Sequence, residues 1–180
     1  MKQDLYIFID YWQLNQYMYR VKQFLWAIIS FFKKIDDNIL EKYLDSKEIE
    51  LFMKLKKSEQ HHSIRVCKDS LKMCEINNLN KYKMAKISLL HDIGKIEGSL
   101  NVIEKSILVI MNKLTKGKMK NIKNNKKIDL YYNHPIKSVN ILKDINKYDD
   151  EFLDAIKYHH SNELYENNYL KVLKICDEKN

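Results

Sequence analysis

Apolar residues recur every three or four positions along most of this 180-residue chain, which is the spacing of one face of an α-helix. In the first half the spacing predicts a helix over residues 13–32, a second capped by Asp36, a third capped by Ser46, and a further apolar series. The positions expected to face inward are Leu40, Tyr43, Leu44, Ile49, Phe52, Leu55, Ile64, Cys67, Leu71 and Cys74.

The second half of the chain continues the helical spacing, except in one lysine-rich stretch. A helix is expected over residues 81–93, followed by Gly94 where a left-handed C-terminal cap would lie. The next helix is expected to start at Ser99. Residues 113–127 hold seven lysines and predict a mobile solvated loop, whose charge would also attract an anionic substrate. The apolar register of the Ser99 helix is Ile103, Ile107, Ile110, Met111 and Leu114.

Three more helices complete the pattern. Pro135 follows His134 and is expected in a first helical turn, where its missing N–H would have no partner within the helix. Asp149 is expected to cap the next helix, which ends at His159 and His160. The last helix is expected over residues 166–178.

Composition supports a helical fold. Glycine and proline contribute only 3 and 1 residues, while 45% of the chain is hydrophobic and 31% is charged. Reversals between strands need glycine or proline, whereas helices joined by polar linkers do not. The expected fold is therefore all-α, a single-domain helical bundle, and turn-dense β structure, collagen and disorder are excluded. Residues 1–45 are expected to form an N-terminal helical extension packed on a core of residues 46–180.

Charge and cysteine content narrow the partners. The formal net charge is +8, but only Arg20 and Arg65 are arginines, so no stable nucleic acid complex is expected. The lysine-rich stretch is the one feature of the sequence that favours nucleic-acid binding. The three cysteines form no C-x-x-C pair, which indicates a reducing, cytoplasmic setting and buried thiols.

The longest apolar run, residues 24–32, is too short to span a bilayer, so no transmembrane segment is expected. Its flanking lysines leave room for peripheral membrane contact, although a core helix is the preferred interpretation. The oligomeric state is left open.

Histidines and aspartates form the candidate chemistry. Of six histidines, each lies at or near an expected helix end or turn, and several adjoin one another or a carboxylate. Imidazole nitrogens and carboxylate oxygens without thiolates are typical ligands of a catalytic divalent transition metal, since they leave positions open for water and substrate. The histidines are His61, His62, His91, His134, His159 and His160, and Asp92 adjoins His91.

The order of these residues resembles the HD phosphohydrolase superfamily, and its HDIG branch in particular. The motifs that carry the resemblance, over residues 46–178, are His62-Ser-Ile-Arg-Val, His91-Asp92-Ile93-Gly94-Lys95, His134-Pro135, His159-His160 and Asp177. The set is similar to that of the HD-GYP proteins but lacks the GYP motif after the paired histidines, so cyclic di-GMP is not indicated as the substrate.

The resemblance implies roles for individual residues. His62, His91, Asp92 and Asp177 would hold a first metal ion; His134, His159 and His160 would hold a second, with Asp92 bridging the two. His61 lies about 100° from His62 around a helix and is not expected at the site. Lys95 and Arg65 would bind a substrate phosphate, although an acidic neighbour is the more ordinary partner for Arg65. Asp177 lies three residues before the end of the sequence, where a loosely held ligand is expected.

The expected function is that of a metal-dependent phosphohydrolase, a phosphomonoesterase or phosphodiesterase acting on a nucleotide or related small molecule. Two divalent metal ions are expected, iron or manganese ahead of magnesium, cobalt or nickel. Two alternatives stay open at this point. One is an HD-fold di-iron oxygenase, which would need redox-active iron, and the other is a non-catalytic HD-domain ligand-sensing module.

Overall fold

The computed structural model describes residues 33–98, 100, 102–122, 124–146, 148–161, 163 and 165–180. The expected helix over residues 13–32 lies outside this part of the chain. The described residues form helices and contain no strand, which confirms the all-α fold class. In chain order the elements are α2 (Asp37–Tyr43), α3 (Ser46–Met53), α4 (Lys57–Asn77), α5 (Lys81–Leu90), the short 3₁₀ helix η1 (Ile93–Glu97), α6 (Val102–Leu114), the 3₁₀ helix η2 (Lys118–Asn121), α7 (Lys126–Ile145), α8 (Asp150–Lys157) and α9 (Asn168–Lys179).

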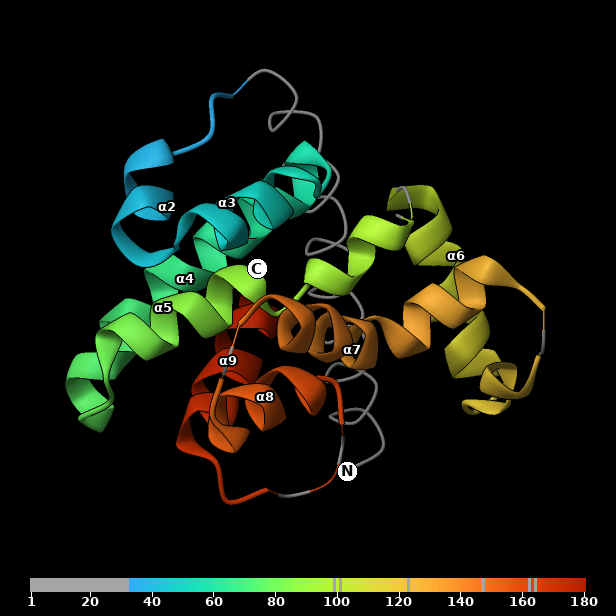
Figure 1. The fold of residues 1–180 in the computed structure, drawn as a ribbon. Helices are drawn as coiled ribbons and strands as arrows, with labels where there is room; N and C mark the ends of the chain where they lie inside the picture. Colours follow the sequence, from blue (N-terminus) through green and yellow to red (C-terminus); the bar gives the residue numbers. More distant parts are fainter. Residues whose placement is uncertain are drawn as a thin grey trace.

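The main apolar core lies between α4 and α5 and the helices that pack on them (Figure 1). Phe52, Met84, Leu89, Leu142 and Leu173 are fully buried and come from four different helices, α3, α5, α7 and α9. The described part of the N-terminal region shares this core through α2. Its expected inward-facing residues are buried, namely Leu40, Tyr43 and Leu44.

The cysteines behave as small apolar residues. Cys67, Cys74 and Cys176 are all buried and free. Burial raises the pKa of the Cys67 thiol to about 12, so it carries no thiolate at neutral pH. The expectation of inert buried thiols is confirmed for Cys67 and Cys74.

One expected helix cap is wrong by a single residue. Asp45, not Ser46, caps α3: its carboxylate accepts from the backbone N–H of Lys47 and Glu48, both at 3.0 Å. Glu48 completes the capping box by accepting from the backbone N–H of Asp45 at 2.8 Å. Asp36 does precede α2, but its carboxylate binds Lys68 at 2.6 Å and not the helix amides.

The stretch of residues 96–130 departs furthest from expectation. Here α6, η2 and the first turns of α7 extend to one side of the bundle (Figure 1) and enclose a small second apolar cluster. The lysine-rich stretch is therefore not simply a solvated loop, because it contains η2, whose Met119 is 1% exposed.

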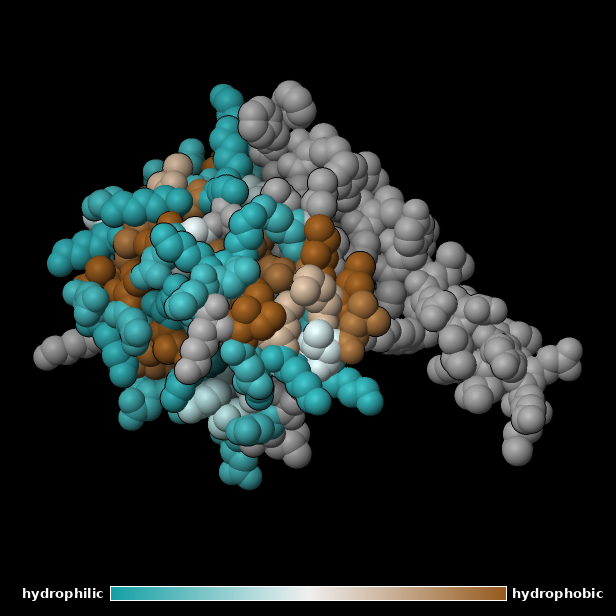
Figure 2. All heavy atoms as spheres, turned by 90° about the vertical axis from the view of Figure 1, so that its right-hand side faces the viewer, coloured by the Kyte–Doolittle hydropathy of each residue, from teal (hydrophilic) through white to brown (hydrophobic). Residues whose placement is uncertain are grey.

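The expected apolar register of α6 is also wrong. Among the α6 side chains that the structure describes, Leu108 lies in the second cluster, whereas Ile107, Ile110, Met111 and Leu114 are 39–77% exposed. Ile103, also expected in this register, is not among the described side chains. Figure 2 shows this side of the molecule, with hydrophobic residues gathered among hydrophilic ones. None of the described helices combines the length and apolar character needed to cross a bilayer.

Candidate metal centre

Five segments that are distant in sequence bring their histidines and aspartates to one point. His62 comes from α4, His134 from α7 and Asp177 from α9. The remaining members lie in turns, His91 and Asp92 between α5 and η1, and His159 and His160 directly after α8. All seven residues singled out from the sequence thus meet in space, in three overlapping groups whose nitrogen and oxygen atoms lie within 4.8 Å of one another.

Asp92 is the centre of this arrangement. Its Oδ2 lies 3.4 Å from Nε2 of His91 and 3.8 Å from Nε2 of His62. Its Oδ1 lies 3.3 Å from Nε2 of His134 and 3.9 Å from Nε2 of His159. The two carboxylate oxygens therefore face two different pairs of imidazoles.

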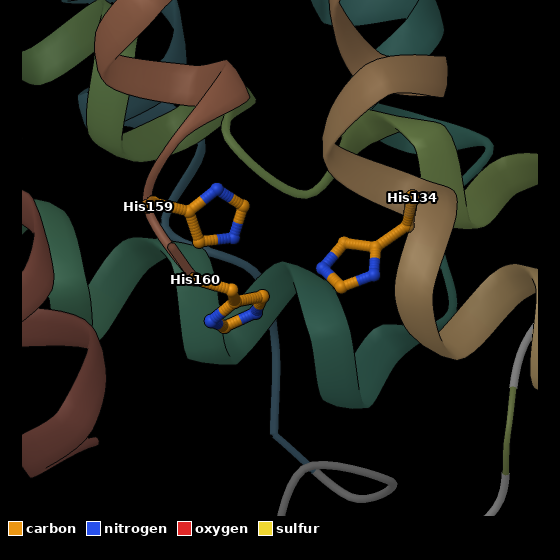
Figure 3. A group of neighbouring side chains, drawn as sticks. All are labelled: His134, His159 and His160. Atoms are coloured by element: carbon orange, nitrogen blue, oxygen red, sulfur yellow. The ribbon is translucent and has the colours of Figure 1, made fainter. Parts of the chain in front are cut away.

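Figure 3 shows one of the three groups, formed by His134, His159 and His160. The rings of His134, His159 and His160 turn toward one another, from α7 on one side and from the turn after α8 on the other. The His134 and His160 ring centroids are 5.0 Å apart, and those of His159 and His160 are 4.0 Å apart. His160 is the outermost member, with half of its side chain exposed, so the centre reaches solvent on its side.

The buried imidazoles are held in one tautomer. The Nδ1 atoms of His91, His134 and His159 lie 2.8, 3.0 and 2.6 Å from the carbonyl oxygens of Ser88, Leu130 and Ile156. A carbonyl can only accept, so each Nδ1 carries a hydrogen, and in the neutral imidazole Nε2 then carries the lone pair.

Those lone pairs meet no donor. Among the described residues, Nε2 of His91, His134 and His159 and Oδ1 of Asp92 are buried without a hydrogen-bond partner. A group of buried acceptors facing one another is unfavourable, because each has lost its water without gaining a donor. Divalent cations bound there would satisfy these atoms, and nitrogen and oxygen donors of this kind suit iron, manganese, zinc or nickel. The donor set therefore fits a metal ion.

Charge at the centre agrees with this assignment. Burial disfavours the charged forms of His134 and His159 and holds the pKa of both imidazoles below the usual value, so both stay neutral at pH 7. Burial opposes ionisation of Asp92 as well, but the charge of Lys95 outweighs it and holds the pKa of Asp92 well below the ordinary range. Neutral imidazoles around an ionised carboxylate are the protonation states that a metal needs.

Asp177 is held more firmly than its place in the sequence indicates. Its Oδ1 accepts from Nε2 of His62 at 2.8 Å and lies 3.6 Å from Nε2 of His91. Burial disfavours the imidazolium of His91, but the negative charges of Asp92 and Asp177 outweigh burial and raise the pKa of His91. The last turn of α9 is tied to α4, where Asp69 binds Lys179 at 2.8 Å.

A single glycine allows the close approach that builds the centre. The helix expected over residues 81–93 ends at Leu90, and Gly94 lies inside η1 and does not adopt the left-handed conformation expected of it. A Cβ at Gly94 would lie 2.2 Å from the carbonyl oxygen of His134 and 2.6 Å from the amide nitrogen of Ser138. Glycine is needed here because η1 packs directly against the backbone of α7.

Proline also has a different place from the one expected. Pro135 lies in the interior of α7, nine residues after its first residue Lys126. Proline has no N–H for the carbonyl four residues earlier, which is that of Tyr131. Nδ1 of His134 lies 3.2 Å from that same oxygen. The proline thus leaves a backbone acceptor for the imidazole, and this helps to fix the ring of His134.

Two residues near the centre were not expected from the sequence. Ser138 joins the two elements around Gly94: its Oγ accepts from the Gly94 N–H at 2.8 Å and lies 2.8 Å from the His91 carbonyl oxygen. Glu59, one turn before His62 on α4, lies 3.3 Å from Nζ of Lys95. A serine and a glutamate inside amphipathic helices carry no local signal that would have marked them.

Lys95, His61 and Arg65 lie at different distances from the centre. Lys95 lies beside the centre, 11% exposed, and its ammonium donates to Oδ2 of Asp92. His61 is directed elsewhere, with Nε2 3.2 Å from the carbonyl oxygen of Lys33. Arg65 is half-buried on α4 near His61, and its expected role in substrate binding stays a prediction.

The chain belongs to the HD domain family. The family described as HD domain matches residues 60–179, two thirds of the 180 residues. Searches of the curated proteins and of the solved structures found no match. HD domains bind divalent metal ions, and most members are metal-dependent hydrolases, although some are not enzymes. The broader part of the resemblance seen in the sequence is thereby confirmed.

Proposed function

We propose that this protein is a metal-dependent phosphohydrolase of the HDIG branch, which cleaves a phosphate ester of a nucleotide or related small molecule. The observation that carries the proposal is the set of buried Nε2 and Oδ atoms around Asp92 that lack hydrogen-bond partners. A purely structural cluster of buried polar groups would be expected to satisfy its own members.

Two divalent ions are proposed. His62, His91, Asp92 and Asp177 would hold the first, and His134, His159 and His160 would hold the second together with Oδ1 of Asp92. When bound, such ions lower the pKa of a water molecule toward neutrality and withdraw charge from the phosphoryl oxygens. Iron or manganese suits this histidine-rich set better than magnesium, which prefers oxygen ligands.

The chain's own residues orient the reaction. Asp92 lies between two pairs of imidazoles, so its two oxygens would fix the positions of the two ions relative to each other. Lys95 is buried beside Asp92 and stays charged, because Asp92 and Glu59 outweigh the effect of burial and raise its pKa. Its ammonium lies directly beside the centre and would stabilise charge that develops on a phosphate oxygen there.

The experiment is hydrolysis of bis(p-nitrophenyl) phosphate and p-nitrophenyl phosphate, which distinguish diesterase from monoesterase activity. Protein stripped with a chelator is expected to be inactive and to recover activity on addition of Mn²⁺. Asp92→Asn is expected to retain less than about a hundredth of the activity. Asp154→Asn, which changes an exposed aspartate on α8, is the matched control and should be fully active.

The same assay separates the proposal from its alternatives. Hydrolysis supported by Mn²⁺ in the absence of oxygen would count against a di-iron oxygenase. Tight metal binding without hydrolysis of either ester or of a panel of nucleotides would instead favour a ligand-sensing module.

A further inference from the structure

The ammonium of Lys95 lies between two buried carboxylates, and only one of them belongs to the metal centre. Lys95 donates to Oδ2 of Asp92, and its Nζ lies 3.3 Å from Oε2 of Glu59. The exposed fractions of the three side chains are 11% for Lys95, 1% for Asp92 and 7% for Glu59. Such a buried group of charges persists only because each member has a partner.

The contact with Asp92 conflicts with metal binding. Oδ2 is the oxygen that faces His62 and His91, and it is the atom that would meet the first metal ion. An ammonium bound to this oxygen occupies its lone pairs and repels an incoming cation. Lys95 must therefore move off Asp92 when the metal ion binds. To remain in its largely buried position, its ammonium then needs another anion nearby.

Glu59 offers the ammonium another anion at the same place. It lies on α4 three residues before His62, so the helix that supplies a metal-binding imidazole also supplies this carboxylate. We propose that Glu59 is a positioning residue that holds Lys95 beside the centre and so releases Oδ2 of Asp92 to the metal ion. This inference rests on the proposed metal-dependent function. It predicts that Glu59 controls metal affinity through Lys95.

The test is a double-mutant cycle on Mn²⁺ affinity, measured by calorimetric titration of chelator-stripped protein without substrate. Wild type, Glu59→Gln, Lys95→Met and the double variant are compared. Glu59→Gln is expected to weaken Mn²⁺ binding by about tenfold, as for other residues that orient a metal ligand. Lys95→Met is expected to bind Mn²⁺ at least as tightly as wild type. In the Lys95→Met background, Glu59→Gln should then change the affinity by less than about twofold.

Two results would overturn the inference. An equal loss of affinity with and without Lys95 would mean that Glu59 attracts or binds the metal ion directly. No loss in either background would mean that Glu59 only supports the fold. If the wild-type protein itself takes up no Mn²⁺, the proposed function fails, and that outcome is distinct from both.

Controls separate positioning from folding. Glu48→Gln changes another buried glutamate, paired with Lys86 at 2.7 Å outside the centre, and should leave Mn²⁺ affinity unchanged. Thermal unfolding of each variant checks that the fold persists. Should Glu59→Gln fail to fold, Glu59→Asp takes its place in the cycle, because it keeps the charge but is one carbon shorter. Its loss of affinity should also vanish in the Lys95→Met background.

Discussion

Replacing Gly94 by alanine should force η1 and α7 apart at the metal centre. The added Cβ would lie 2.2 Å from the carbonyl oxygen of His134, 2.6 Å from the amide nitrogen of Ser138 and 2.9 Å from Cβ of Lys137. Real Cβ atoms essentially never approach other atoms closer than 3.0 Å. Two of the three obstacles are backbone atoms, which cannot turn aside as the end of a side chain can. The two elements must therefore separate by about 1 Å.

The displacement acts on stability and on the metal centre together. Overpacking of this kind costs about 1–3 kcal/mol, and loss of the hydrogen bond from the Gly94 N–H to Ser138 adds about 1 kcal/mol. Asp92 directly precedes η1, so the shift also changes the 3.3 Å separation between its Oδ1 and Nε2 of His134. Metal affinity should fall by about tenfold or more. Urea unfolding and Mn²⁺ titration measure the two effects.

Gly98→Ala is the matched control. Among the described residues, the neighbour within 4 Å of a Cβ added at Gly98 is Leu130 Cδ2 at 3.7 Å, which is an ordinary contact, and the backbone is extended. This variant should bind Mn²⁺ as wild type does and unfold at a similar urea concentration. Full stability and full metal affinity of Gly94→Ala would refute the close packing of η1 against α7.

Two further variants test other parts of the structure. Pro135→Ala restores an N–H for the carbonyl of Tyr131, so the free energy of unfolding should rise by about 1–3 kcal/mol. Mn²⁺ affinity should fall by about tenfold, because the imidazole of His134 then competes for that carbonyl. Unchanged affinity would contradict this role of the proline. Asp69→Asn should lower the free energy of unfolding by about 1 kcal/mol at pH 7. The hydrogen bond from Lys179 holds the pKa of Asp69 well below its usual value, so the contribution of Asp69 to stability is complete above about pH 5 and is lost progressively as the pH falls further. A difference between wild type and variant that persists undiminished at pH 2 would count against the pair.

Local patterns predicted the helices well because they depend on short-range physics. The spacing of Leu40, Tyr43 and Leu44 placed one face of α2 in the core, and Asp149 caps α8 as expected by accepting from Phe152 N at 2.8 Å. The expectation that Asp177 would be loosely held was wrong, because it ignored contacts with other helices. Its partner His62 lies on α4, far away in the sequence.

The errors concern positions that only contacts between elements decide. Gly94 was assigned to a left-handed cap because glycine often follows a helix, whereas it is needed for the approach of α7. Pro135 was placed in a first turn because proline is usually excluded from helix interiors, and here the imidazole of His134 uses the carbonyl that the proline leaves without an N–H donor. Glu59 had no local signal, since its partner Lys95 lies on another element.

The candidate centre could be foreseen as a set of residues but not as a geometry. The order of the histidines and aspartates indicated which side chains belong together. The division of Asp92 between two pairs of imidazoles, and the tautomers set by the carbonyls of Ser88 and Ile156, depend on how five segments pack. Their roles as metal ligands stay predictions until a metal ion is measured.

The most direct test is elemental analysis of protein purified without added metal, with Asp92→Ala beside it. Because Asp92 faces both groups of imidazoles, the wild-type protein should contain about two equivalents of iron or manganese and the variant little of either. About one equivalent would restrict the centre to a single ion. Absence of metal from the wild-type protein, with none taken up on titration, would contradict the central claim.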